Sequence, residues 1–174
     1  VPRVPTMETP EFRAWFDGSR VVTPEGSPLV LYHGTASDFN EFKTSKYENG
    51  TYFTPRLPYA EGRGRVAALM ARGREAGGEN VMPVYLRMEN PAPTGYGVDR
   101  AKAEGFDGLV RGEGNMKEYV VFRPEQIKSA IGNRGTFDPS NADIRFSRAS
   151  SVIASIHNID QEKIRRTVSD LWFN

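Results

Sequence analysis

The stretch PLVLYHGT, residues 28–35, is the part of the sequence from which fold and function are best inferred. Residues 29–32 are a short apolar run with the composition of a β-strand. The run leads directly into His33 and Gly34, which place a hydrogen-bonding ring and a backbone without a side chain at the strand end. A lone histidine is usually structural or simply exposed. Beside a glycine that lets the backbone approach a ligand, it indicates a binding site.

Two other blocks place polar or aromatic side chains at the edges of predicted strands. They read GTYFT, residues 50–54, and EYVVF, residues 118–122. Neighbouring side chains on a strand point to opposite faces, so one of Tyr52 and Phe53 must face inward. We predict Phe53 in the core and Tyr52 on the ligand side. Taken alone, Glu118 is most simply a strand-end carboxylate facing water, and its functional interpretation depends on the other two blocks.

The remaining pattern predicts short strands and few helices without regular β–α–β alternation. Such an order favours an α+β domain over a doubly wound sheet. The glycines form no G-x-G-x-x-G after a strand, so a dinucleotide would not be held as in a Rossmann fold. Pro83 is expected to begin or interrupt its strand. Beyond the three blocks, helices are predicted at residues 12–16, 58–74 and 100–104, and strands at 21–22, 81–88, 108–110 and 127–131.

Changes in composition divide the chain into three parts. Residues 1–10 carry three prolines and little pattern, and we expect a leader there. Residues 11–148 are expected to form the domain. Residues 149–174 regain a helical spacing of apolar side chains, which predicts a helical appendage or the first helix of a following domain.

The composition excludes several kinds of chemistry. The chain of 174 residues has no cysteine and two histidines, which rules out disulfides, thiolate nucleophiles and Cys-ligated zinc, and we expect no metal. A formal net charge of +1 gives no bulk reason to expect nucleic-acid binding. No apolar run approaches the roughly 20 residues of a membrane-spanning helix, and the first residues lack a secretory pattern. We therefore expect no membrane association and a cytoplasmic location.

Together, the three blocks resemble the His-Tyr-Glu signature of ADP-ribosyltransferases, in the branch of diphtheria toxin and the poly-ADP-ribose polymerases. The order and context match: His-Gly-Thr ends a strand, Tyr-Phe follows a glycine, and Glu-Tyr-x-Val opens a late strand. A closer resemblance, from Phe12 through Arg148, is to the ADP-ribosyltransferase-like domains of phage and mobile-element polyvalent proteins. It is carried by residues 28–35 and by FDPSNADIRFS, residues 137–147. It implies a split, mostly antiparallel sheet with few short helices and a central NAD cleft.

The resemblance also implies roles for individual residues, with Glu118, His33 and Tyr52 as the catalytic set. Glu118 hydrogen-bonds a ribose hydroxyl beside the reacting carbon. Its charge stabilises an oxocarbenium-like transition state, by about 3–4 kcal/mol if it resembles a single oxyanion-hole donor. Tyr52 stacks under the nicotinamide cation, a contact of about 0.5–2 kcal/mol. His33 hydrogen-bonds ribose hydroxyls of NAD, the backbone of Gly34 grips the nicotinamide amide, and Thr35 supports the turn.

The sequence departs from the pattern of this branch at one position and from a related branch at another. A second aromatic residue often covers nicotinamide from the far side, and the aligned position here is Arg63. Either Tyr59 supplies that second face or the site has only one, and Arg63 faces the NAD pyrophosphate or lies on a solvated helix face. The branch that modifies arginine usually carries Glu-x-Glu, whereas Met116 stands two residues before Glu118. We therefore consider arginine a less favoured acceptor residue for ADP-ribose.

These residues lead to one main hypothesis and two alternatives. The main hypothesis is an NAD-dependent ADP-ribosyltransferase that releases nicotinamide and modifies a macromolecule, as a phage or toxin effector acting in the host-cell cytoplasm. We expect a host protein as acceptor, with RNA or DNA left open, and an acceptor loop at residues 108–117. The alternatives are an NAD glycohydrolase, in which water is the acceptor, and an inactive NAD-binding or virion interaction module within a larger phage protein.

Overall fold

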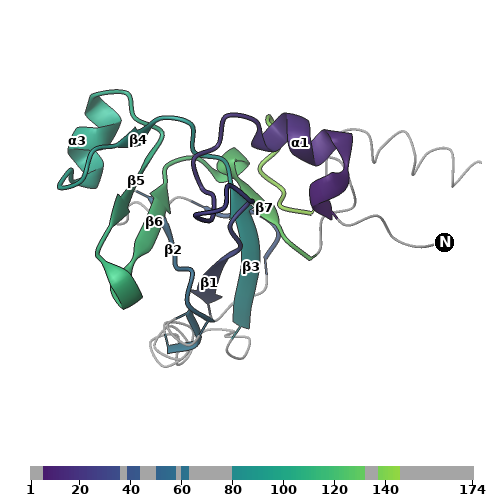
Figure 1. The fold of residues 1–174 in the computed structure, drawn as a ribbon, viewed down its shortest axis with the longest axis horizontal. Coiled ribbons are helices and arrows are strands. Elements are labelled where there is room, and N and C mark those ends of the chain that lie inside the picture. The colour runs from purple at the N-terminus through teal and green to yellow at the C-terminus, as the bar shows by residue number, and fades with distance from the viewer. Residues whose placement is uncertain are drawn as a thin grey trace, which may run out of the picture.

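The computed structural model describes residues 6–35, 39–43, 50–57, 60–62, 80–131 and 137–145. These residues form two small β-sheets with short helices at their edges (Figure 1). One sheet has the strand order β1-β3-β7 and the other the order β2-β6-β5-β4. The strands are β1 (Leu31–Thr35), β2 (Thr51–Phe53), β3 (Asn80–Leu86), β4 (Pro91–Ala92), β5 (Gly108–Arg111), β6 (Glu118–Val121) and β7 (Ile127–Ser129).

The two sheets join where β1 passes β2. Tyr32 and Thr54 exchange two backbone hydrogen bonds, with N···O distances of 2.8 and 3.0 Å, outside the regular ladders. Every strand pair is antiparallel except β4 with β5. The predicted α+β class with a split, mostly antiparallel sheet is therefore confirmed.

Strand β1 begins and ends later than the sequence predicted. The apolar run suggested residues 29–32, with the following three residues beyond the strand end, but β1 spans Leu31–Thr35. His33 and Gly34 pair with Met82 and Val81 of β3. Strand β1 extends further because antiparallel pairing depends on the partner strand, and β3 runs alongside the polar residues as well as the apolar ones.

Pro83 lies inside β3 and does not interrupt it, contrary to the prediction. Its partner in the register is Tyr32, whose backbone N–H and carbonyl bond Thr54 instead of β3. The pairing with β7 covers only residues 84–86 of β3. The missing N–H of proline therefore falls where neither neighbouring strand needs it, which is how a central strand tolerates this residue.

The helices are short and positioned by local signals. Helix α1 (Pro10–Phe16) has proline in its first turn, and the Thr9 hydroxyl accepts a hydrogen bond of 3.2 Å from the Phe12 N–H. Gly18, with φ of 76°, follows its end. Helix α3 (Val98–Ala103) confirms the helix predicted at 100–104. Single-turn 3-10 helices are η1 (Thr6–Glu8), η2 (Gly114–Met116) and η3 (Pro124–Gln126).

Three hydrophobic clusters hold these elements together. The main cluster lies against both sheets and includes Leu31, Phe53 and Tyr119. A second, beneath α3, includes Leu109 and Val120 from the opposite face of the second sheet. The third is aromatic and packs α1 against β3 and the segment near residue 137. Phe53, 1% exposed, is a core residue as predicted.

The FDPSNADIRFS motif forms a strap over β7 as far as it is described, to residue 145. Asp138 and Asn141 accept hydrogen bonds from backbone N–H groups two residues later, so the strap is a series of tight local turns. Ile144 bonds the backbone of Ser129 in β7 and adds its side chain to the main cluster. The motif is thus structural. The predicted appendage at 149–174 and most of the predicted helix 58–74 lie outside the described residues; residues 57 and 60–62 are helical.

Lys128 of β7 is fully buried beneath this strap. Its ammonium group donates hydrogen bonds to the backbone carbonyls of Asn141 and Asp143, at 2.6 and 3.2 Å. Burial lowers the pKa of Lys128 below its usual 10.5, and the negative charge of Asp138 partly opposes that change. The folded chain therefore releases this proton at a lower pH than the unfolded chain does.

Lys128 should make stability rise with pH in alkaline solution. Between the lowered pKa and 10.5 the unfolded state binds more protons, so the free energy of unfolding increases, by at most about 1.4 kcal/mol per pH unit. Urea unfolding from pH 7 to pH 10.5 should show this rise in wild type relative to Lys128→Met. The exposed Lys43→Met should keep it. Identical pH slopes in wild type and Lys128→Met would contradict the burial of a titrating amine.

Candidate functional site

Tyr52 and Glu118 lie on one face of the second sheet. Tyr52 is paired with Val120 across β2 and β6, and Glu118 is two residues before Val120 on β6. Directly paired residues and residues two apart share a face, so all three side chains emerge on the same side. Their neighbours Phe53 and Tyr119 pack into the main cluster on the other side. The sequence prediction that Phe53 and Tyr52 face opposite ways is confirmed.

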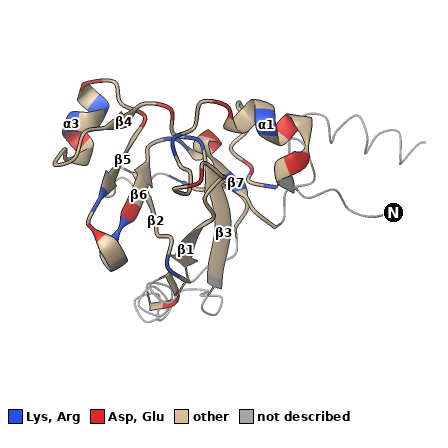
Figure 2. Cartoon of the chain, viewed as in Figure 1, with Lys and Arg blue, Asp and Glu red and all other residues tan. Residues whose placement is uncertain are grey.

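Glu118 is held by an arginine from the next strand. The register pairs Arg111 of β5 with Glu118, and the basic and acidic segments lie side by side in Figure 2. Two nitrogens of Arg111, Nε and Nη2, each lie 2.8 Å from Oε2 of Glu118. The side chain of Glu118 is 11% exposed and that of Arg111 is 52% exposed. A carboxylate this buried needs such charged hydrogen bonds.

The same guanidinium also covers Tyr52. The Cζ atom of Arg111 lies over the Tyr52 ring, 4.5 Å from its centroid. This distance is within the range of a cation–π contact. Tyr52, Arg111 and Glu118 are therefore one contiguous group, in which an aromatic face and a carboxylate hold a planar cation between them.

His33 is joined to this group through the backbone. Its Nδ1 lies 2.9 Å from the carbonyl oxygen of Tyr52. A carbonyl only accepts, so Nδ1 is the donor in this contact and carries a proton. The ring packs against Phe42 and Phe53, with centroids at 5.0 and 5.4 Å, and lies 6.5 Å from Phe39. These contacts fix the orientation of the imidazole from the core side of β2.

Of the other predicted binding residues, two lie on β1 and two lie outside the described residues. Gly34 is half-buried on β1 beside His33, and Thr35 is 8% exposed at the end of that strand. Tyr59 and Arg63, the candidates for a second nicotinamide face, lie outside the described residues. The structure thus groups Tyr52 with Glu118 and joins His33 to the backbone of β2, whereas Gly34 pairs with Val81 of β3.

The predicted acceptor loop is only partly a loop. Residues 108–111 form β5, so the connection before Glu118 is the hairpin of residues 112–117, containing η2. Met116, at the position of the first glutamate in Glu-x-Glu sequences, is 59% exposed. Gly112 has φ of 70°, and a Cβ there would lie 2.3 Å from the backbone oxygen of Met116. The hairpin that sets Arg111 against Glu118 therefore requires glycine at this position.

A substitution at Gly112 should damage this hairpin. Gly112→Ala combines left-handed backbone strain with a backbone clash, and we expect a loss of unfolding free energy of about 1–3 kcal/mol. Gly114→Ala is the matched control: Gly114 also has positive φ, of 50°, but a Cβ there meets nothing within 4 Å. The free energies of unfolding of the two variants, from thermal or urea unfolding, are compared. The difference between them gives the cost of the clash with Met116, because both variants carry the backbone strain. Equal losses in both would show that the Met116 contact is unimportant.

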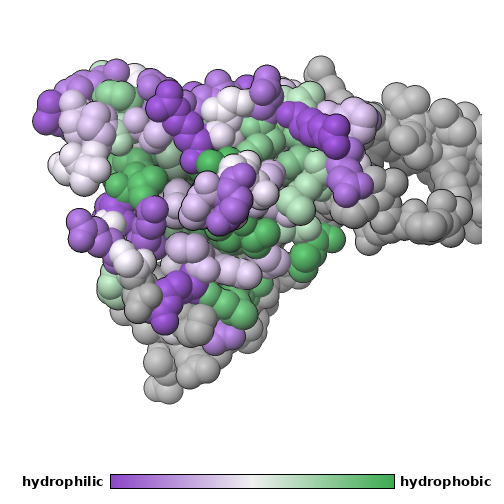
Figure 3. Space-filling model, viewed as in Figure 1, coloured by the Kyte–Doolittle hydropathy of each residue, from purple (hydrophilic) through white to green (hydrophobic). Residues whose placement is uncertain are grey.

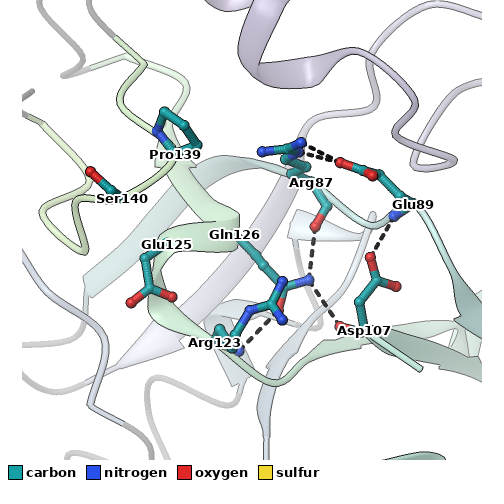
Figure 4. A pocket seen from close by; sticks show the side chains of 8 residues that line it. All are labelled: Arg87, Glu89, Asp107, Arg123, Glu125, Gln126, Pro139 and Ser140. Atoms are coloured by element: carbon teal, nitrogen blue, oxygen red, sulfur yellow. Dashed lines mark hydrogen bonds and ion pairs between the residues drawn. The ribbon is translucent and has the colours of Figure 1, made fainter. Parts of the chain in front are cut away.

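A hollow of about 530 Å³ lies elsewhere, at the far end of β6 from Glu118 (Figure 4). Its lining includes Arg87, Asp107 and Arg123, and Gln126 forms its floor. The Gln126 amide is fully engaged, donating to the carbonyls of Arg87 and Asp107 and accepting from the N–H groups of Phe122 and Arg123. These four hydrogen bonds fix the Gln126 side chain within the lining of the hollow.

Sequence reasoning missed Arg111. The residue follows a short predicted strand and has no motif around it, and its pairing with Glu118 depends on the hairpin register. The available signal was the spacing: a basic residue at the end of one strand and an acidic one at the start of the next, separated by a glycine-rich turn.

Comparison with known proteins identifies the family of the chain. A model of the family described as ADP-ribosyltransferase in polyvalent proteins matches residues 24–96 and 92–137. The chain belongs to this family. The matched residues of this ADP-ribosyltransferase domain include His33, Tyr52, Arg111 and Glu118, whereas α1 precedes them. No curated protein and no solved structure matched the chain at the significance required.

Three further observations concern the described part of this ADP-ribosyltransferase-like domain. Among its described residues, no group of three or more His, Cys, Asp or Glu side chains is placed to hold a metal ion. Within the same ranges no helix has the length and apolar character to cross a membrane. Hydrophilic side chains predominate over α1 and α3, and hydrophobic side chains reach the surface between them (Figure 3).

Proposed function

We propose that this domain transfers ADP-ribose from NAD to a macromolecular acceptor, with a protein as the expected acceptor, and releases nicotinamide. Membership of the family supports the reaction class. The observation that carries the proposal is the group on the second sheet, where the Tyr52 face and the Glu118 carboxylate flank a planar cation. Nicotinamide in NAD is also a planar cation, and a carboxylate beside it would stabilise the positive charge that develops on ribose as the bond between them breaks.

In the proposed reaction, the bond between nicotinamide nitrogen and ribose C1′ breaks. Its electron pair stays on the ring nitrogen, so nicotinamide leaves neutral and needs no general acid. Positive charge moves to C1′ and the ribose ring oxygen. The acceptor then supplies an electron pair to C1′ and loses a proton to Glu118 or to solvent. One carboxylate therefore suffices, in contrast to glycosidases with two.

Each of the grouped residues has a part in this scheme. Glu118 hydrogen-bonds a ribose hydroxyl and stabilises the positive charge that develops at C1′. Tyr52 binds the nicotinamide cation and loses part of that attraction as the ring becomes neutral, which favours departure of the product. His33 is expected from the resemblance to hydrogen-bond a ribose hydroxyl, and its ring orientation is set by the hydrogen bond between Nδ1 and the Tyr52 carbonyl.

Incubating the purified chain with NAD labelled in the adenosine half, in the presence of a cell lysate, tests the proposal. Nicotinamide release accompanied by label on protein is the expected result. Label on RNA or DNA would change the acceptor class, and release without labelling would indicate a glycohydrolase. No release of nicotinamide under any of these conditions would contradict the enzymatic proposal. An NAD-binding or interaction module would then be the remaining hypothesis.

A further inference from the structure

Arg111 stands where the proposed substrate would place its nicotinamide ring. The guanidinium lies over Tyr52 at 4.5 Å, its Nε donates a hydrogen bond of 2.8 Å to Oε2 of Glu118, and its Nη2 forms an ion pair of 2.8 Å with the same oxygen. Guanidinium and nicotinamide are both planar cations, and both suit an aromatic face beside a carboxylate. Two cations cannot lie over the same ring face, because they overlap in space and repel each other.

The fold holds Tyr52 and Glu118 in place, whereas the side chain of Arg111 is more exposed. The Tyr52 side chain packs against the cluster that includes Leu109 and Val120, so part of its surface is already used by the fold. Arg111 is half-exposed and sits at the end of β5, next to the hairpin. Its side chain can therefore swing into solvent without disturbing the sheet, whereas Tyr52 and Glu118 are anchored on β2 and β6.

We propose that Arg111 occupies the nicotinamide position in the NAD-free protein and that NAD must displace it to bind. This inference rests on the proposed function of the same site. Arg111 is then a positioning residue that keeps Glu118 and Tyr52 in place before substrate arrives, and an internal competitor of nicotinamide. It selects against ligands whose nicotinamide end is too weakly attracted to Tyr52 and Glu118 to replace a guanidinium.

Removing the competitor should tighten binding of ligands that carry a nicotinamide cation. The test measures affinity by calorimetry for carbocyclic NAD, in which a methylene replaces the ribose ring oxygen so that no oxocarbenium ion can form. From a cation–π contact and a partly exposed ion pair, we expect Arg111→Ala to lower its Kd about five- to tenfold. ADP-ribose, which lacks nicotinamide, should bind wild type and variant equally.

Two further variants serve as controls for this measurement. Arg111→Lys keeps a partner for the buried Glu118 but cannot lie flat on Tyr52, so we expect a smaller decrease in Kd, about two- to threefold. Arg123→Ala, at the far end of β6, should change neither affinity. Retained cooperative unfolding of each variant shows that the fold is intact, and the lysine variant carries the test if the alanine variant is poorly folded.

Several outcomes would overturn the inference. An unchanged Kd for carbocyclic NAD in Arg111→Ala and Arg111→Lys would mean that nicotinamide does not compete with Arg111. Weaker binding of both carbocyclic NAD and ADP-ribose would make Arg111 a direct ligand of the ADP-ribose part. Both results leave the proposed function standing. If wild type and variants all fail to bind carbocyclic NAD, the proposed function fails together with the inference.

Discussion

Nicotinamide release should fall about 10²–10³-fold when Glu118 is replaced by glutamine, by analogy with loss of one preorganised electrostatic group in other active sites. The glutamine amide has nearly the shape of the carboxylate, so the ribose contact is largely kept. The negative charge is lost, and with it the stabilisation of the cation that develops at C1′. The loss should appear in kcat, because the charge matters most in the transition state.

Glu113→Gln is the matched control for this variant. Glu113 lies in the same hairpin, is exposed, and makes no side-chain cap to η2. Its replacement should leave nicotinamide release within about twofold of wild type, because surface changes of this kind are close to neutral. Steady-state release at saturating NAD compares the two variants. Equal activity of Glu118→Gln and wild type would remove Glu118 from the chemistry.

The second large effect concerns the stability of the domain and comes from the aromatic cluster under α1. Phe12 is 1% exposed and lies 5.3 Å from Phe16, 5.0 Å from Tyr85 and 4.9 Å from Phe137, measured between ring centroids. Truncating a phenylalanine in such a position leaves a cavity, and Phe12→Ala should reduce the free energy of unfolding by about 3–5 kcal/mol. A domain of this size has roughly 5–15 kcal/mol in total, so the variant should be close to unfolding at 37 °C.

Arg13→Ala, on the exposed side of α1, separates cavity formation from effects on the helix itself. It should change the free energy of unfolding by less than about 0.5 kcal/mol. Urea unfolding followed by far-UV circular dichroism gives both values. A loss in Phe12→Ala no larger than in Arg13→Ala would mean that α1 is not packed against β3 and the strap as described.

The features predicted correctly from sequence depend on short-range pattern. The spacing of Phe12, Trp15 and Phe16 marks one face of a helix, and α1 buries all three. Alternation along a strand separates Tyr52 from Phe53, and the burial of Phe53 follows from it. These inferences need only the period of the backbone, which is fixed by its geometry.

The features that were missed depend on strand register. Arg111 reaches Glu118 only because the hairpin pairs them, and the length and shape of that hairpin depend on Gly112. Lys128 is buried although lysine is among the most exposed residue types, because carbonyls of the strap receive its ammonium group. His33 was placed at a strand end, yet it lies within β1 because β3 continues beside it. Each of these depends on how segments are paired in the folded chain, which the local period of the sequence does not determine.

The most direct test of the account is a crystal structure of the wild-type chain with carbocyclic NAD. We expect the nicotinamide ring over Tyr52, within about 6 Å of its centroid, with a ribose hydroxyl hydrogen-bonded to Glu118 and Arg111 turned away into solvent. Nicotinamide bound elsewhere, for example in the hollow between Arg87 and Arg123, with the guanidinium of Arg111 still lying over Tyr52, would contradict it.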